Sequence, residues 1–235
     1  MIIGLVGFIG AGKGTVGEYL KLDGYHQGSF AGALKDTAST LFGWDRALLE
    51  GDTVESRNFR ESIDVWWTNR FGYEFTPRLA LQLLGTEAGR NVFHSDVWIY
   101  SLEKRIENLK DVVLTDTRFP NEIEFIRSKG GIIIEVSRGQ KPEWYETALK
   151  QNQYGIDREY ELFDEGLCME QLYPNIHISE WSWIGQKVDY TIYNDGTLDD
   201  LISNVRKILT QIKNDDTMVT QLNNGDSNET FEWHN

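Results

Sequence analysis

The chain has 235 residues and a formal net charge of −14, from 37 acidic and 23 basic side chains. This length suits one large α/β domain, and so acidic a chain disfavours binding to nucleic-acid backbones or anionic membranes. Because Cys168 is the only cysteine and no apolar run approaches the roughly 18 residues of a membrane span, we expect a soluble, cytoplasmic protein.

A glycine-rich loop follows the first apolar run. Residues 2–6 have the pattern of a buried strand, residues 16–20 begin an amphipathic helix, and the loop 7–15 lies between them. Strand, glycine loop and helix in this order are typical of a P-loop, whose backbone amides and helix N-terminus bind phosphate. We therefore expect ATP to bind at Gly10, Ala11, Gly12, Lys13, Gly14 and Thr15.

This loop departs from the common pattern in one place. Ser or Thr usually follows the lysine directly, but here Gly14 follows Lys13 and the hydroxyl comes at Thr15. Gly-Lys-Gly-Thr resembles the loop of adenylate-kinase-like nucleotide kinases. The alternative, a glycine turn without a ligand, is disfavoured by the flanking strand and helix patterns.

The next part of the chain contains one irregular stretch. Residues 43–77 lose periodicity and combine tryptophans with arginines. This mixture indicates either an inserted segment that faces substrate or a surface helical excursion packed by its tryptophans. Around it we expect a short strand within 24–30 and helices at 32–42, 78–84 (ended by Gly85-Thr86) and 98–109.

An apolar run at 112–115 predicts a strand buried on both faces, and Asp116 follows it. Such an aspartate resembles a Walker-B element, which can hold Mg²⁺. Residues 137–187 are again irregular and predict a second insertion. The other expected elements are a helix at 121–129, strands at 132–136 and 188–193, and a helix from Thr197, with a capping box to Asp200, to about 212.

Strands that alternate with helices predict an α/β fold with a parallel sheet and helices on both faces, of the P-loop NTPase type. We expect a kinase domain at 1–213, with lid or acceptor-binding insertions at about 43–77 and 137–187. The acidic tail 214–235 contains no Lys or Arg and is expected to be disordered. Ligands of such folds bind beyond the carboxyl ends of the strands.

Three segments resemble the deoxynucleoside monophosphate kinases of T-even bacteriophages. They are Phe30-Ala31-Gly32-Ala33-Leu34-Lys35-Asp36, Arg78 through Gln82-Leu83-Leu84-Gly85-Thr86, and Thr115-Asp116-Thr117-Arg118-Phe119-Pro120-Asn121-Glu122. Weaker similarities lie at 138–141, 177–180 and 194–197. The resemblance spans about residues 1–212 and implies an adenylate-kinase-like nucleotide kinase, located in the host cytoplasm if a phage encodes it.

The resemblance also implies site residues. Those toward the deoxynucleoside monophosphate would be Lys35, Arg78, Gln82, Gly85, Thr86, Asn91, Asp96, Trp98 and Glu180. Lys13, Arg118 and Asp116 would be catalytic, and Arg138 would close over ATP. Ordinary alternatives remain: Lys35 can be solvated, Arg78 can cap a helix or pair on the surface, and Trp98 can belong to the core.

The leading hypothesis is therefore an enzyme, a phosphotransferase that uses ATP and Mg²⁺ to phosphorylate deoxynucleoside 5′-monophosphates. Thr15 and Asp116 are the expected metal contacts, and arginines suit the migrating phosphoryl group because they bind phosphate bidentately. No nucleic-acid or membrane partner is expected, and a homodimer is left open. The alternatives are a P-loop kinase for another small metabolite or a modified base, and a non-catalytic ATP-binding switch.

Overall fold

The computed structural model describes residues 1–154 and 168–225. Its centre is a five-stranded sheet in which every neighbouring pair is parallel, in the order β2-β3-β1-β4-β5. The P-loop strand is thus the middle one. The strands are β1 (Ile2–Val6), β2 (His26–Gly28), β3 (Val112–Leu114), β4 (Ile132–Ser137) and β5 (Tyr190–Tyr193). The predicted α/β fold with a parallel P-loop sheet is confirmed.

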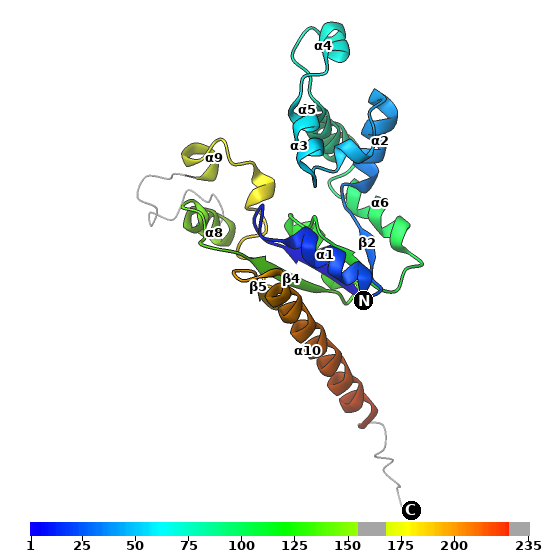
Figure 1. Cartoon of the computed structure of the whole chain (residues 1–235), viewed down its shortest axis with the longest axis vertical. Helices are drawn as coiled ribbons and strands as arrows, with labels where there is room; N and C mark the ends of the chain where they lie inside the picture. Colours follow the sequence, from blue (N-terminus) through cyan, green and yellow to red (C-terminus); the bar gives the residue numbers. More distant parts are fainter. Residues whose placement is uncertain (155–167, 226–235) are drawn as a thin grey trace, which may run out of the picture.

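Helices cover both faces of the sheet (Figure 1). On one face, α1 (Lys13–Leu22) and α10 (Leu198–Gly225) bury Val16, Leu20 and Val205 against Leu5 and Ile134. On the other face, α6 (Val97–Ile106) and α7 (Pro120–Ser128) pack on β1 and β3. Because both faces are buried, the central strands β1 and β3 are apolar along their whole length.

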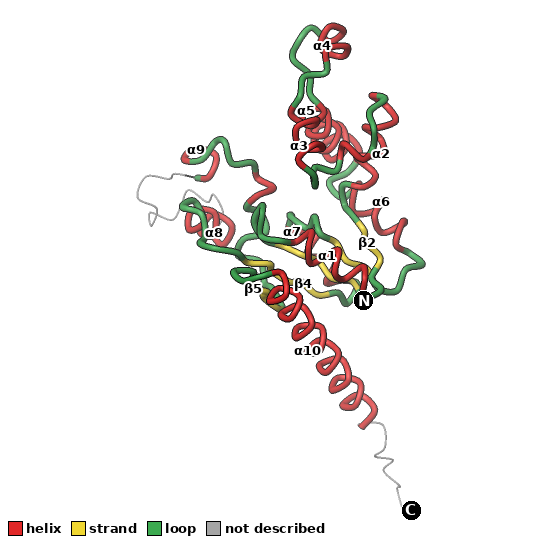
Figure 2. Tube along the Cα trace, viewed as in Figure 1, coloured by secondary structure: helices red, strands yellow, loops and turns green. Residues whose placement is uncertain are grey.

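A third, helical layer lies beyond the sheet (Figure 2). It consists of α2 (Gly32–Phe42), η1 (Ala47–Leu49), α3 (Val54–Glu61), α4 (Val65–Phe71), α5 (Pro77–Gln82) and the π-helix η2 (Leu83–Phe93). Its small core contains Trp44, Leu49 and Phe75. Residues 43–77 are therefore helical and packed around Trp44, as one of the two alternatives predicted, and a substrate-facing role for this segment stays a prediction.

The second predicted insertion is partly helical. It includes α8 (Tyr145–Tyr154), α9 (Met169–Leu172) and the short η3 (Ile178–Glu180), while residues 155–167 lie outside the described part of the chain. Trp181, Trp183 and Ile184 are buried in the same core as α6 and α7. This segment is consequently anchored to the sheet along much of its length.

Two predicted helix ends differ from the structure by more than a helical turn. The helix expected to end at Gly85-Thr86 continues as the π-helix to Phe93, because its wide turn wraps around Trp98, whose indole N–H donates to the carbonyl oxygen of Gly85 at 2.8 Å. The C-terminal helix continues to Gly225 rather than ending near 212, so 214–225 is helical. The first turns of α10 are packed on the sheet, so the unfavourable step of helix nucleation is already complete. Each further residue then adds a backbone hydrogen bond.

The expected capping box at the start of α10 is confirmed, since Thr197 and Asp200 exchange side-chain to backbone hydrogen bonds of 2.9 and 3.2 Å. Residues 226–235 of the predicted tail lie outside the described residues. Among the described helices, none is both long and apolar enough to cross a bilayer.

Candidate active site at the P-loop

The loop after β1 has the backbone conformation of a phosphate cradle. Gly7 and Gly12 have φ values of +139° and +106°, and a Cβ atom on Gly7 would lie 2.3 Å from the carbonyl oxygen of Val136. The amide of Ala11 donates to the carbonyl oxygen of Phe8 at 3.2 Å, which closes the turn before α1 begins at Lys13. The glycines are required here because side chains rarely adopt these angles.

Lys13 lies within this loop. Its Nζ donates to the carbonyl oxygens of Gly7 (2.5 Å) and Phe8 (2.9 Å). Burial, and then the charge of Arg118, lower the pKa of Lys13 to about 8, while Glu180 acts in the opposite direction. The ammonium group is therefore held in an environment that disfavours its charge, and a bound anion would restore it.

Two neighbouring segments support the P-loop. The amide of Asn194, at the end of β5, donates to the carbonyl oxygen of Ala11 at 2.8 Å. On the other side, the ring of Phe8 makes edge contacts with Trp144 and Trp183, with centroids 5.5 and 5.2 Å apart. The loop is thus tied both to the sheet and to the 137–187 segment.

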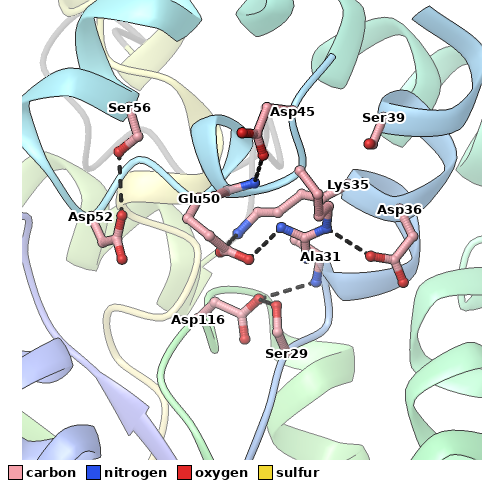
Figure 3. A network of polar contacts seen from close by, with 12 residues as sticks. Ser29, Ala31, Lys35, Asp36, Ser39, Asp45, Glu50, Asp52, Ser56 and Asp116 are labelled. Carbon is pink, nitrogen blue, oxygen red and sulfur yellow. Dashed lines mark hydrogen bonds and ion pairs between the residues drawn. The ribbon is translucent and has the colours of Figure 1, made fainter. Parts of the chain in front are cut away.

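Asp116 lies at the carboxyl end of β3, as predicted, but its carboxylate is already hydrogen-bonded (Figure 3). It accepts from the hydroxyl of Ser29 (2.7 Å) and from the amides of Phe30 (3.2 Å) and Ala31 (3.0 Å). Asp116 therefore fixes the entrance to α2. Its lone pairs leave room for a hydrated cation, and Thr15 is exposed on the first turn of α1. Both are oxygen donors, which fits Mg²⁺.

Lys35 belongs to a charged network above Asp116 (Figure 3). Its Nζ lies 2.5 Å from a carboxylate oxygen of Glu50, which also pairs with Arg46. Arg46 and Arg105 in turn bind Asp36, each at 2.7 Å. The Lys35 side chain is 14% exposed, so the structure places this predicted acceptor residue in an ion pair that joins α2 to η1.

A cavity of about 480 Å³ opens beside the P-loop residues Phe8 and Ile9. Three predicted site residues line it, namely Arg78, Arg138 and Glu180. Glu180 also binds the guanidinium group of Arg118 at 3.2 Å. The structure therefore brings one predicted donor-side residue, Arg138, and two predicted acceptor-side residues, Arg78 and Glu180, together around one cavity.

Arg60, on α3, was not singled out from the sequence. Among the described residues it has no carboxylate within ion-pair distance, and its buried Nε has no hydrogen-bond partner. Burial, and then the charges of Arg78 and Arg118, lower the pKa of Arg60. The sequence showed only that residues 43–77 are rich in arginine; which arginine turns inward depends on the packing of α3 against α5.

The other predicted acceptor residues lie along α5 and the π-helix. Gln82, Thr86 and Asn91 are exposed there, and Asp96 follows and accepts from the side-chain amide of Asn121 at 2.7 Å. Gly85 and Trp98 lie beneath this surface in contact with each other. Trp98 therefore supports the turn, and its predicted contact with a base stays a prediction.

Glu122 is a second residue that the sequence reading left without a role. It is 2% exposed, and its carboxylate accepts from the amides of Arg118 (2.8 Å) and Phe119 (3.1 Å) and from the guanidinium group of Arg90 (3.1 Å). Burial raises the pKa of Glu122 to about 7, against these hydrogen bonds. The Glu122 carboxylate thus holds the backbone of Arg118 and Phe119 in place.

The comparisons with known proteins found two curated relatives and many solved structures. A protein of Acanthamoeba polyphaga mimivirus, named as a deoxynucleotide monophosphate kinase, is 33% identical over 154 residues, which cover 59% of this chain and 74% of the relative. The deoxynucleoside-5′-monophosphate kinase of Escherichia phage T5 is 50% identical over 54 residues, 22% of either chain. A shikimate kinase of Bacteroides thetaiotaomicron aligns with a TM-score of 0.42 at 13% identity, over 91% of this chain and 98% of that one. No protein-family model matches the chain.

The pKa of Lys13 makes ATP affinity dependent on pH. Above pH 8 the free protein holds Lys13 neutral, so binding must take up a proton, and affinity falls about tenfold between pH 7 and pH 9. Calorimetric titration in two buffers of different ionisation enthalpy measures the proton uptake. Lys13→Arg, which stays charged, should lose this dependence; an equal affinity of the wild type at both pH values would contradict the assignment.

Glu122 should make stability fall as pH rises. Its folded pKa of about 7 exceeds the ordinary 4.5, so the extra stability is complete below pH 4.5 and is lost through pH 7. From pH 8 to pH 5.5 the wild type should gain about 1–2 kcal/mol in free energy of unfolding relative to Glu122→Gln. Urea unfolding at both pH values measures this. The exposed Glu124→Gln on the same helix should show no such gain, and a pH-independent difference for Glu122→Gln would refute it.

Proposed function

Because this chain belongs to the deoxynucleoside monophosphate kinase family, we propose that it transfers the γ-phosphoryl group of ATP to a deoxynucleoside 5′-monophosphate. The observation that carries this proposal is a group of neighbouring cations next to the P-loop: Arg78 lines the cavity beside Phe8 and Ile9, Arg118 lies near Lys13, and Arg60 lies near both arginines. A plain ATP-binding switch has no need of these arginines, whereas an enzyme that binds a second phosphorylated substrate does.

On the donor side, the amides of Gly10 to Thr15 and the ammonium group of Lys13 would bind the phosphates of ATP. Arg138, which lines the cavity, would close over them. Mg²⁺ would be held by Thr15 and, through water, by Asp116, together with phosphate oxygens; bound there, it neutralises charge on the donor phosphates. Asp116 in addition keeps the start of α2 in place through its bonds to Phe30 and Ala31.

On the acceptor side, Arg60 and Arg78 would bind the phosphate of the monophosphate in line with ATP. An acceptor oxygen then forms a bond to the γ-phosphorus, the bond from that phosphorus to the β,γ-bridging oxygen breaks, and ADP leaves. Arg118 would neutralise the negative charge of the migrating phosphoryl group, and the ammonium group of Lys13 would stay in contact with that group during transfer. Gln82, Thr86 and Asn91 would face the nucleoside, since they are exposed along the same continuous helical segment.

A coupled assay with ATP and each of the four common deoxynucleoside monophosphates tests the function. At least one should release ADP well above the ATP-only background, because the acceptor completes the site and excludes water. Lys13→Ala should abolish this transfer and remain folded, while the exposed Lys21→Ala on the same helix should keep it. A background rate with all four acceptors would overturn the proposal.

Arg60 should matter for the acceptor rather than for ATP. Removing a charged partner of phosphate costs about 2–5 kcal/mol when the group is desolvated, so Arg60→Met should raise KM for the monophosphate at least tenfold with KM for ATP unchanged. The matched control is Arg57→Met on the same helix, whose guanidinium group is exposed and, within the described part of the chain, bonds only backbone oxygens of Asp52 and Thr53. Equal effects of both variants, or a loss of ATP affinity, would contradict the assignment.

A further inference from the structure

The backbone at Arg118 is connected through Glu122 to the π-helix η2. The Oε2 atom of Glu122 accepts from the amides of Arg118 and Phe119, and its Oε1 atom binds the guanidinium group of Arg90 at 3.1 Å. Arg90 lies on the π-helix η2, which carries the exposed Thr86 and Asn91. One buried carboxylate thus joins the acceptor-side helix to the backbone of Arg118.

Two further contacts position the Arg90 side chain. Its second nitrogen donates to the carbonyl oxygen of Ser95 at 3.1 Å, and its guanidinium carbon lies 4.7 Å from the centre of the Phe119 ring. A parallel contact between Asn121 and Asp96, at 2.7 Å, joins the same two segments. Residues 90–96 and 118–122 are therefore joined by two separate polar contacts.

This arrangement is costly for stability. Glu122 is almost completely buried, and the charge of Asp116 also disfavours its ionisation. A buried ion pair contributes little net stability, because desolvation offsets the attraction between the charges. A π-helix is likewise rare and is found mostly at functional sites. An apolar contact would join the two segments more cheaply, so the pair needs another explanation.

We propose that Arg90 and Glu122 form a positioning link that couples the acceptor-binding π-helix to Arg118, so that a bound monophosphate fixes the Arg118 guanidinium at the transfer point. This inference rests on the proposed function. Neither residue touches the reacting atoms; both act through Arg118, whose side chain is held on its far side by Ser179 and Glu180, each at 3.2 Å. The link makes ATP turnover depend on the presence of an acceptor.

A double-mutant cycle tests the link. Arg90→Met should lower kcat with a monophosphate about 10- to 100-fold, the loss expected when a reacting group moves by up to about 1 Å, with KM for ATP unchanged. Arg90→Lys keeps the charge and should recover most of the rate. In an Arg118→Met background, Arg90→Met should cause no further loss, since its effect passes through Arg118. Losses that multiply in the double variant would overturn the proposal.

Two further measurements make the result decisive. Arg127 lies on α7, the helix of Glu122, and forms an ion pair of similar length with Asp189 at 3.2 Å. Arg127→Met breaks this pair and should leave kcat unchanged. If Arg90→Met fails to fold, Glu122→Gln replaces it and should lower kcat in the same way, because it removes the charge that pairs with Arg90. The side-chain amide oxygen of the glutamine can still accept from the backbone N–H groups of Arg118 and Phe119.

The proposed function and the link can fail separately. A wild type without transfer to any of the four monophosphates contradicts the function alone. The link is then judged by the Nε–H resonance of Arg118, assigned by its loss in Arg118→Lys: Arg90→Met should shift or broaden it, and Arg127→Met should not. An unchanged resonance in Arg90→Met would refute the link whatever the activity.

Discussion

Like charges are concentrated at one place in an otherwise acidic protein. The charge of Arg118 lowers the pKa of the neighbouring Lys13, and the charges of Arg78 and Arg118 lower the pKa of Arg60. These cations repel one another unless carboxylates or a bound anion offset their charge. Two carboxylates have this task, since Glu61 pairs with Arg78 and Glu180 with Arg118, whereas the buried Nε of Arg60 has no hydrogen-bond partner among the described residues.

The two inserted segments are organised around the same constraint. The 43–77 segment forms its own small core around Phe75 and Leu49, which gives α3 enough rigidity to hold the half-buried Arg60. The 137–187 segment is held by aromatic contacts to Phe8 of the P-loop and supplies Glu180. Each segment therefore supports one charged group, and the cavity lies between the P-loop, Arg78 and the 137–187 segment.

The sequence predicted what local patterns determine. The P-loop, the order of strands and helices and the Thr197 capping box follow from glycine spacing, apolar periodicity and near-neighbour hydrogen bonds, and the structure confirms them. The inward turn of Arg60, the buried Glu122 and the pairing of Lys35 with Glu50 depend on contacts between segments distant in sequence. The helix end expected at Gly85 failed for the same reason, because Trp98, 13 residues later, stabilises a wider turn there.

Asp116 shows how one motif can serve two purposes. Its position after a buried strand suggested a metal ligand, yet its carboxylate binds Ser29, Phe30 and Ala31 at the entrance to α2. A carboxylate committed to three donors is better suited to orienting a hydrated cation than to direct coordination. The loop itself agrees with this, since the hydroxyl that usually follows the lysine is displaced to Thr15. The aspartate expected to contact Mg²⁺ thereby also fixes the start of α2.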